Sequence, residues 1–347
     1  MRPVSASRVA QALFAPARLA ARAAAAIGCL SVIVIGAGCG SQGSPAAGAP
    51  AADGTVTVAV VPGVDNATLA LADQGGVFRR NGLTVKIVHY GTVGQELSAL
   101  RSGTAGIAAA DYADLFFAQA TSPTATYKIV ADGYDAAPGV LELMTLPGSQ
   151  ITSPIQLAGQ RIAVSDSQRV GAPKDAPDSL AVAAAASVLE SFGVNLTAVN
   201  WQNMPPRDEI RALAHGQVQA ALLAEPYIYQ AQRDLGAVKL IDACSGSTAG
   251  LPLSGYFTTV SFARQHPAVV AAFKLGIEEA AAQASMPGPV AAVLPRYARM
   301  TRQEASLVTI GSYPTSTIAA SLQRTADLLS AEGVIRNRVN VAAMIIS

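Results

Sequence analysis

Short apolar runs alternate with amphipathic stretches from Thr55 onward. The runs have the length and the flanking polar residues of buried strands, while stretches such as 68–80 and 95–101 show the three- and four-residue spacing of helices. This alternation predicts β-α-β units, and therefore a parallel sheet with helices on both faces. The predicted strands of this first series are Val56–Val61, Leu83–Tyr90, Ala105–Ala109 and Ile129–Gly133.

A second series of strands and helices follows residue 160. A long helix is predicted over 179–192, with Asp178 or Ser179 as its N-cap and Gly193 as the residue that ends it. The pattern after Ser261 predicts helices throughout. The predicted strands of this series are Arg161–Ser165, Val199–Gln202, Ala220–Leu223 and Val238–Ile241.

The two series are similar to each other in sequence. Residues 100–112 align without gaps with residues 213–225, and residues 58–62 align with residues 162–166. In the longer pair a helix ends at a glycine, and a short strand follows. The chain is therefore expected to form two α/β halves built on one plan.

An acidic residue with an aromatic neighbour follows the equivalent strand in each half. These are Asp111, beside Tyr112, and Glu225, close to Tyr227. Ligands of open α/β sheets bind outside the carboxyl ends of the strands, so the two acids are expected on opposite walls of a shared cleft. The alternative is a structural role for each acid at the start of the next helix. For Glu225 this role is less apt, because Pro226 would make it the N-cap, where glutamate is not a preferred residue.

The N-terminus has the pattern of a secretory signal. Four arginines and no acidic residue precede an apolar run over 23–38, which is shorter than the roughly 20 residues of a membrane span. Residues 35–39 resemble a bacterial lipobox, with Gly36 where leucine is usual, which predicts acylation at Cys39. An ordinary cleaved signal or an uncleaved anchor is the alternative. We therefore expect a lipoprotein signal peptide over 1–38 and a flexible tether over 39–54.

Charge and cysteine content exclude several other classes of protein. The formal net charge is +1, but four of the 24 basic residues lie in the first 22 residues, so the mature chain is mildly acidic and offers no footprint for a nucleic acid. Cys244 is the one cysteine expected in the folded body, so no internal disulfide can form. It lacks zinc-ligand spacing, which predicts a buried structural residue.

Residues 70–120 resemble the solute-binding proteins of bacterial ABC importers. The similar features are Gly76–Phe78 with Asn81–Gly82 before the second strand, the stretch 157–164, and the turn 225–227, where Ala224 replaces the usual tryptophan. The nearest subgroup binds aliphatic sulfonates, taurine, nitrate and the pyrimidine precursor of thiamine. The resemblance extends over about residues 55–295 and lies in the order and spacing of these features together.

This resemblance implies an α/β protein with the type II periplasmic-binding-protein fold. One lobe would comprise 55–138 plus 251–347 and the other 139–250, with hinges near 133–141 and 245–256 that allow closure around a ligand. The expected partners are a small-molecule solute, an ABC importer permease and the membrane through an N-terminal lipid. The protein is expected to be a monomer without cofactor or metal, on the outer face of the cytoplasmic membrane.

The expected ligand-binding residues lie in the loops that follow the strands. A mostly apolar pocket with a few placed polar groups is typical of such sites. Three of the tyrosines in this set, Tyr112, Tyr134 and Tyr227, have core packing as the alternative. The expected residues are Pro62, Asp65, Asn66, Tyr90, Gly91, Thr92, Asp111, Tyr112, Tyr134, Ser165, Ser167, Glu225 and Tyr227.

The second-lobe loop over 165–171 departs from the anion loop of the resembled family. It carries Asp166 where that family is rich in glycine, serine and threonine, and Asp65, Asp111, Asp135 and Glu225 add further acids near the expected cleft. A ligand with N–H donors, such as an aminopyrimidine, an amine or taurine, is therefore expected to fit better than a bare anion.

Two other classes of function remain open. Relatives with this fold act on thiamine or menaquinone precursors, so an enzyme is one alternative, and a lipoprotein that contacts a partner without a transport ligand is the other. The sequence gives little support to an enzyme, because its histidines form no metal-binding or nucleophile motif. These are His89, His215 and His266.

Overall fold

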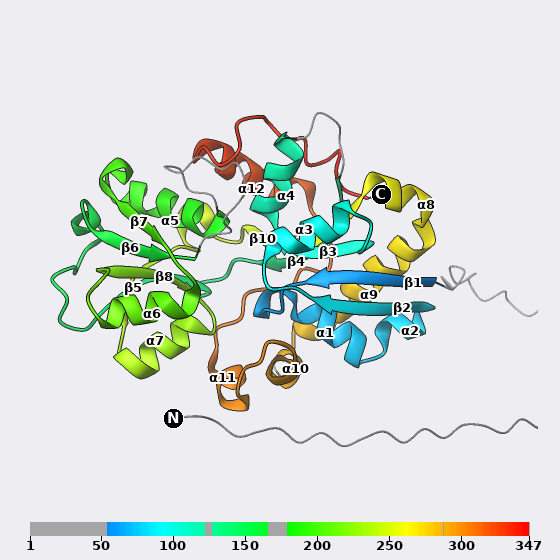
Figure 1. Ribbon diagram of the computed structural model, residues 1–347, viewed down its shortest axis with the longest axis horizontal. Coiled ribbons are helices and arrows are strands. Elements are labelled where there is room, and N and C mark those ends of the chain that lie inside the picture. Colours follow the sequence, from blue (N-terminus) through cyan, green and yellow to red (C-terminus); the bar gives the residue numbers. More distant parts are fainter. Residues whose placement is uncertain (1–53, 122–126, 166–178, 287, 347) are drawn as a thin grey trace, which may run out of the picture. The chain divides into compact units, whose positions relative to one another are not determined.

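The structure, a computed structural model, describes residues 54–121, 127–165, 179–286 and 288–346. Its strands form two sheets of five strands each. Sheet A has the strand order β2-β1-β3-β10-β4 (Figure 1). Its strands are β1 (Gly54–Val60), β2 (Leu83–His89), β3 (Ile107–Asp111), β4 (Tyr127–Asp135) and β10 (Pro252–Thr259).

Sheet B has the strand order β7-β6-β8-β5-β9. In both sheets the strands of the β-α-β units run parallel, and one strand runs antiparallel to its neighbours: β10, the last strand of sheet A, and β5, the first strand of sheet B. The strands of sheet B are β5 (Leu141–Thr145), β6 (Arg161–Val164), β7 (Asn200–Asn203), β8 (Ala220–Ala224) and β9 (Val238–Asp242).

Helices cover both faces of each sheet. In sheet A, α3 and α4 pack on one face and α1 and α9 lie on the other, whereas in sheet B α5 lies opposite α6 and α7 (Figure 1). Among the described residues, no helix has both the length and the apolar character needed to cross a bilayer. The helices are α1 (Ala67–Gln74), α2 (Val77–Arg80), α3 (Val93–Arg101), α4 (Tyr112–Thr121), α5 (Leu180–Ser191), α6 (Pro206–Ala214), α7 (Tyr227–Leu235), α8 (Val260–Gln265), α9 (Pro267–Ala284), α10 (Pro289–Tyr297), α11 (Arg302–Leu307) and α12 (Ala319–Ala331).

The internal repeat of the sequence is present in the strand register. In sheet A, Val58 of β1 pairs with Ile107 of β3, and in sheet B, Ile162 of β6 pairs with Ala220 of β8. The sequence alignment matches these same positions, 58 with 162 and 107 with 220. Strands β3 and β8 also begin and end at aligned residues. The prediction that the two halves share one plan is confirmed.

The helix predicted over 179–192 is confirmed with its caps. Helix α5 spans Leu180–Ser191, and the Ser179 side chain accepts a hydrogen bond from the Val182 amide. Gly193 follows with a φ of 77°, a conformation that glycine adopts without steric cost.

Strands β5 and β10 were missing from the sequence prediction. Each is antiparallel and contains polar residues within its apolar pattern, with Glu142 in β5 and Ser254 and Gly255 in β10. The pattern of alternating strands and helices therefore did not reveal them. The helix predicted over 68–80 is also divided in two, because Gly76 adopts a φ of 66° between α1 and α2.

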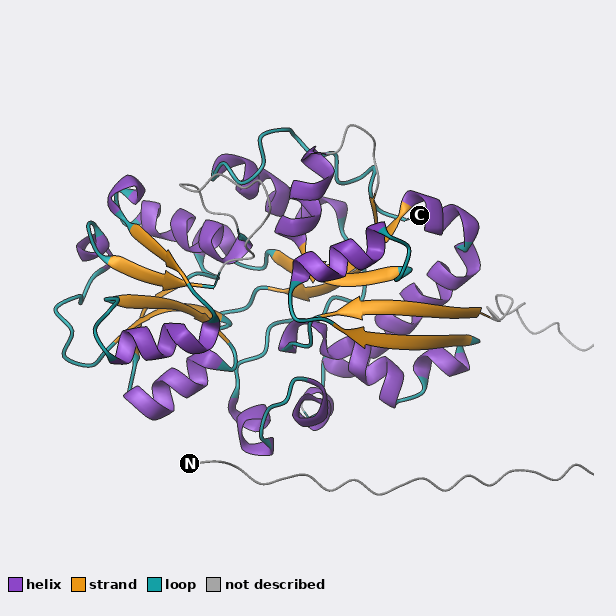
Figure 2. Ribbon diagram, in the orientation of Figure 1, coloured by secondary structure: helices purple, strands orange, loops and turns teal. Residues whose placement is uncertain are grey.

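The prediction that the chain is wholly helical after Ser261 is wrong for two segments. Residues 308–318 and 332–346 run mostly without helix, as the loops around α12 in Figure 2 show. Ser312 forms an isolated bridge with Asp135 of β4, and Ile345 forms another with Ile129. These segments therefore add backbone pairing to β4.

The chain crosses between the two sheets at residues 136–140, inside the first segment predicted as a hinge, and at residues 243–251, which overlap the second predicted segment, 245–256. The Asp242 carboxylate accepts the Gly139 amide at 2.8 Å and the Cys244 amide at 2.9 Å, so one side chain binds both crossings. Cys244 is buried and free, as predicted. Motion at these segments stays a prediction.

A glycine in α9 sits where a side chain would displace the core. A Cβ on Gly276 would lie 2.6 Å from Phe78 Cδ1, and Phe78 stacks on Phe273 at 5.2 Å. We expect Gly276→Ala to lower the free energy of unfolding by about 1–3 kcal/mol through overpacking. Urea unfolding measures this change.

The matched control for Gly276→Ala is Gly94→Ala in α3, where an added Cβ would meet no atom within 4 Å. This variant should raise stability by about 0.4–1 kcal/mol. Equal effects of the two substitutions would contradict the packing argument.

Candidate functional site

The loops that follow β1 and β2 line a cavity of about 400 Å³. Pro62 comes from the loop after β1, and Tyr90 and Gly91 come from the loop after β2. His89, Ala298 and Arg299 complete the lining. The cavity therefore lies at the carboxyl edge of the parallel strands, where this class of sheet binds ligands.

The loop after β1 also contains Asp65 and Asn66. Burial raises the pKa of the half-buried Asp65 carboxyl, and a hydrogen bond with Ser254 acts in the opposite direction. The Asn66 amide donates to the Val61 carbonyl at 3.0 Å and its oxygen accepts the Gly63 amide at 3.2 Å. The side chain of Asn66 therefore holds the loop itself.

Two predicted residues cap helices at the same edge. The exposed Thr92 is the N-cap of α3, and its hydroxyl accepts the Gln95 amide at 3.4 Å. Asp111 accepts the Ala113 amide at 2.5 Å in the first turn of α4. For Asp111 the geometry matches the alternative expected from the sequence, a structural partner of the helix start.

The predicted tyrosines occupy three different environments. Tyr112 is fully buried, and its hydroxyl donates to Asp132 Oδ1 at 2.8 Å, which favours the packing alternative. Tyr134 is buried, and its hydroxyl accepts the Gly311 amide at 2.6 Å. Tyr227 is half-buried and packs beside the apolar cluster of sheet B.

Both oxygens of the Glu225 carboxylate accept backbone hydrogen bonds. Oε2 accepts the Tyr229 amide at 3.1 Å, and Oε1 accepts the Thr309 amide at 3.0 Å. Helix α7 begins at Tyr227 with Pro226 as the N-cap, so Glu225 precedes the cap and still serves the first turn. Glu225, the residue after β8, thus links α7 to the distant segment that contains Thr309.

That segment, residues 309–313, contacts both halves of the protein. Gly311 fits closely, since a Cβ there would lie 2.4 Å from the Asp135 carbonyl oxygen. We call residues 309–313 the strap. Its hydrogen bonds run from Thr309 to Glu225, from Gly311 to Tyr134, between Ser312 and Asp135, and from the Tyr313 hydroxyl to the Val64 carbonyl.

The remaining predicted positions contribute little that can be described. Ser165 is exposed after β6, while Ser167 and Cys39 lie outside the described residues, as do Asp166 and Asp178. The cavity therefore brings together Pro62, Tyr90 and Gly91 of the predicted set, whereas Glu225 and Tyr134 are hydrogen-bonded to the strap.

Sequence reasoning missed a buried acid beneath the cavity loops. Glu96 of α3 is fully buried, and its Oε1 accepts the Val61 amide at the end of β1. Burial raises the pKa of Glu96 to about 10, with a smaller lowering by the Val61 amide and small contributions of the same sign as burial from the nearby Asp65 and Asp114. The signal was present, because Glu96 shares a helix face with Leu100, four residues on.

The buried acids reduce the negative charge that a count of carboxyl groups suggests. Burial raises the pKa of Glu96 to about 10 and of Asp135 to about 6, and it raises the pKa of Asp65 and Glu225 as well. Glu225 also directs both oxygens at backbone amides. The acid count therefore gives weak support to the expected preference for ligands with N–H donors.

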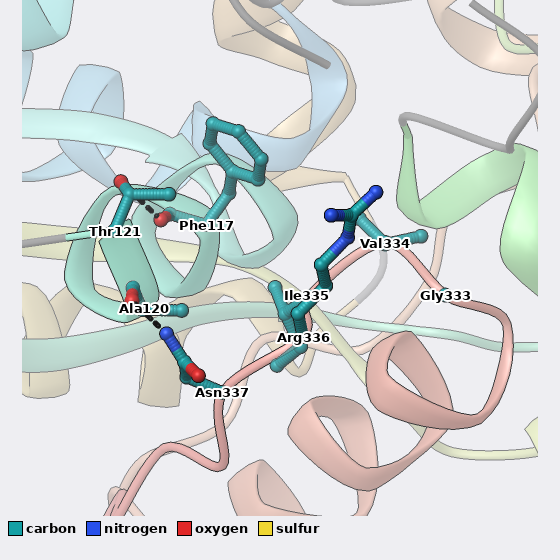
Figure 3. A pocket seen from close by; sticks show the side chains of 8 residues that line it. All are labelled: Phe117, Ala120, Thr121, Gly333, Val334, Ile335, Arg336 and Asn337. Carbon is teal, nitrogen blue, oxygen red and sulfur yellow. Dashed lines mark hydrogen bonds between the residues drawn. The ribbon is translucent and has the colours of Figure 1, made fainter. Parts of the chain in front are cut away.

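A second pocket lies away from the strand ends, between the end of α4 and the chain after α12 (Figure 3). The Asn337 amide donates to the Ala120 carbonyl at 3.0 Å, and the Thr121 hydroxyl donates to the Phe117 carbonyl at 2.8 Å. The first of these hydrogen bonds joins the C-terminal segment to α4, and the second lies within the last turn of α4. No group of three or more potential metal ligands occurs among the described residues.

Comparison with solved structures shows which fold this is. The periplasmic aliphatic sulphonate binding protein SsuA from Escherichia coli is similar with a TM-score of 0.67 at 19% identity, over 84% of this chain and 92% of that chain. The alkanesulfonate-binding protein SsuA from Xanthomonas axonopodis pv. citri, bound to MOPS, gives 0.63 at 20% identity, over 86% and 99%. The desulfurization enzyme DSZB gives 0.63 at 16% identity, over 84% and 96%.

These similarities define the chain as a protein with the periplasmic-binding-protein fold. The family profile described as NMT1/THI5 like matches residues 64–292, which is more than half of the chain. The chain therefore belongs to the NMT1/THI5-like family. Comparison with curated proteins finds no significant match.

Glu96 should make stability depend on pH. The carboxyl is protonated in both folded and unfolded chains below its ordinary pKa of 4.5, whereas between 4.5 and about 10 the folded chain alone keeps the proton. Its contribution to stability is therefore lost as pH rises through this window. We expect the free energy of unfolding of Glu96→Gln to fall less steeply with pH than that of the wild type, by up to about 1.4 kcal/mol per pH unit.

Urea unfolding between about pH 5.5 and 8.5 measures this difference in slope. Glu278→Gln in α9 is the control, since the Glu278 side chain is only partly buried and its replacement should leave the slope unchanged. Parallel curves for the wild type and Glu96→Gln would contradict the assignment.

Glu225 should stabilise the protein without ligand. In Glu225→Gln, an NH₂ group replaces one of the two oxygens that accept backbone amides. That NH₂ group would face a backbone N–H, and since both are donors, one of the two hydrogen bonds is lost. We expect a loss of about 1–3 kcal/mol in the free energy of unfolding at neutral pH. Unchanged stability, with Glu278→Gln again as control, would show that these hydrogen bonds contribute nothing.

Proposed function

We propose that the protein is a solute-binding receptor that captures a small organic solute and releases it unchanged. The observation that carries this proposal is the cavity of about 400 Å³ at the carboxyl edge of sheet A. Its volume lies within the range of small-molecule sites, about 300–1,000 Å³. Membership of the NMT1/THI5-like family and the sulfonate-binding names of similar structures support the same role.

We propose further that the receptor delivers its solute to an ABC importer permease from the outer face of the cytoplasmic membrane. The support is in the sequence: the arginine-bearing apolar segment, the lipobox-like residues 35–39 and the tether over 39–54. Acylation of Cys39 would hold the folded body near the permease. Loss of lipid label in Cys39→Ala, with release of the protein from the membrane fraction, tests this step.

Binding without chemistry is favoured over an enzyme of the same fold. Cys244 is the one cysteine in the described residues, and burial raises its pKa to about 12, so it supplies no reactive thiolate. Of the three histidines, His89 alone lines the cavity. The desulfurization enzyme DSZB shows that the fold also hosts catalysis, so recovery of a chemically altered solute would revive the enzyme alternative.

A ligand screen tests the receptor function. The panel comprises aliphatic sulfonates, taurine, nitrate, pyrimidines and small amines. A true solute should stabilise the folded chain by about 2.7 kcal/mol at a hundredfold excess over its Kd. Thermal unfolding detects this shift, and mass spectrometry of the released compound checks that it is unchanged.

A matched pair of variants locates the site. Gly91 lines the cavity, whereas Gly94 lies three residues on in α3 with open space around it. Gly91→Leu should fill the cavity and lower the affinity for the solute found in the screen at least tenfold. Gly94→Leu should leave that affinity unchanged. Equal affinities of the two variants would place the solute elsewhere.

A further inference from the structure

A buried glutamate occupies the same place in each half of the protein. The gapless match of the two halves extends towards the N-terminus, so that residues 96–103 align with residues 209–216 and Glu96 aligns with Glu209. Each is the fourth residue of a nine-residue helix, α3 or α6, and each is fully buried. The two glutamates are therefore equivalent in sequence, in helix position and in burial.

The two carboxyl groups differ in their hydrogen bonds. Glu96 Oε1 accepts the amide of Val61, the residue after β1. Among the residues that the structure describes, neither oxygen of Glu209 has a hydrogen-bond partner. Burial raises the pKa of Glu209 to about 9, so the group is a neutral carboxyl near pH 7. A buried acceptor without a donor costs free energy, because folding removes its water and supplies no replacement.

The donor equivalent to the Val61 amide is the amide of Ser165. Ser165 follows β6 as Val61 follows β1, and the alignment of 58–62 with 162–166 matches the two residues. Ser165 is exposed, and its amide has no hydrogen-bond partner within the described part of the chain. The second half therefore holds both members of the hydrogen bond that the first half forms, and holds them apart.

The backbone leading to this difference is the same in both halves. The Val60 carbonyl at the end of β1 accepts the Tyr90 amide at 2.9 Å, and the Val164 carbonyl at the end of β6 accepts the Met204 amide at 3.0 Å. Helix α3 packs on β1 and α6 packs on β6. The two halves first differ at the next amide along the chain, the one that Glu96 binds in the first half.

We propose that Glu209 is a positioning residue, which binds the Ser165 amide in a second arrangement of the chain as Glu96 binds the Val61 amide. The contact would fix Ser165 against α6. In the first half the equivalent contact fixes the residue before Pro62, which lines the cavity. Since Ser165 is one of the expected ligand-binding residues, Glu209 would set the position of a binding group in the second half. The inference goes beyond the proposed function, because the contact needs no solute.

Hydrogen exchange at single amides, measured by NMR on the protein without solute, tests the contact. In the wild type the Ser165 amide should exchange about tenfold or more slowly than in an unstructured chain, because exchange requires the hydrogen bond to open. Glu209→Met removes the acceptor, so the Ser165 amide should then exchange within about threefold of the unstructured rate. Glu209→Gln keeps an acceptor oxygen and should keep the protection.

The first half supplies the positive control. The Val61 amide should be protected in the wild type and should lose this protection in Glu96→Met. Glu209→Met should fold as the wild type does, because Ala212 and Leu213 on the same helix face belong to an apolar cluster that accepts a thioether side chain. Thermal unfolding checks that each variant is folded before its exchange is measured.

Three outcomes would overturn the contact. They are a wild-type Ser165 amide that exchanges at the unstructured rate, equal protection in the wild type and Glu209→Met, and loss of protection in Glu209→Gln as well as in Glu209→Met. The receptor function fails separately, since it depends on the ligand screen and the exchange measurement contains no solute.

Discussion

Parallel strands place all their carboxyl ends at one edge of a sheet, and the candidate site depends on this constraint. In sheet A the pairing of β1 with both β2 and β3 brings the loops after them together, so Pro62, Tyr90 and Gly91 meet around one cavity although they are far apart in sequence. Sheet B repeats the same register between β6 and β8. The direction of the strands, more than any one side chain, therefore determines where the site lies.

The acids near this edge act mainly as acceptors for backbone amides. Glu96 accepts the Val61 amide, Asp242 accepts two amides at the crossings, and Glu225 accepts one amide in α7 and another in the strap. Such carboxyl groups fix loops at defined places at the cost of desolvation, which raises the pKa of Glu96 and Glu225. A ligand at the cavity then meets less negative charge than the sequence suggests.

The sequence predicted those features that depend on local patterns. The gapless match of 100–112 with 213–225 predicted an equivalent strand in each half, and β3 and β8 lie there, with β3 two residues later than predicted. Ser179 and Gly193 marked the ends of α5. Features that depend on distant contacts were not predictable in this way. Strand β10 pairs with β3 and β4 from more than a hundred residues away, and Arg299 reaches the cavity only because α10 packs beside α1.

Glu225 already has partners within the protein at the position where the sequence predicted a ligand contact. Its carboxylate accepts the Thr309 amide of the strap, and the contact with a ligand stays a prediction. Tyr134 likewise accepts the Gly311 amide of the strap. A solute that contacts either residue must therefore share it with the strap or displace the strap. Since the cavity lined by Arg299 uses neither residue, its ligand can bind while these hydrogen bonds remain in place.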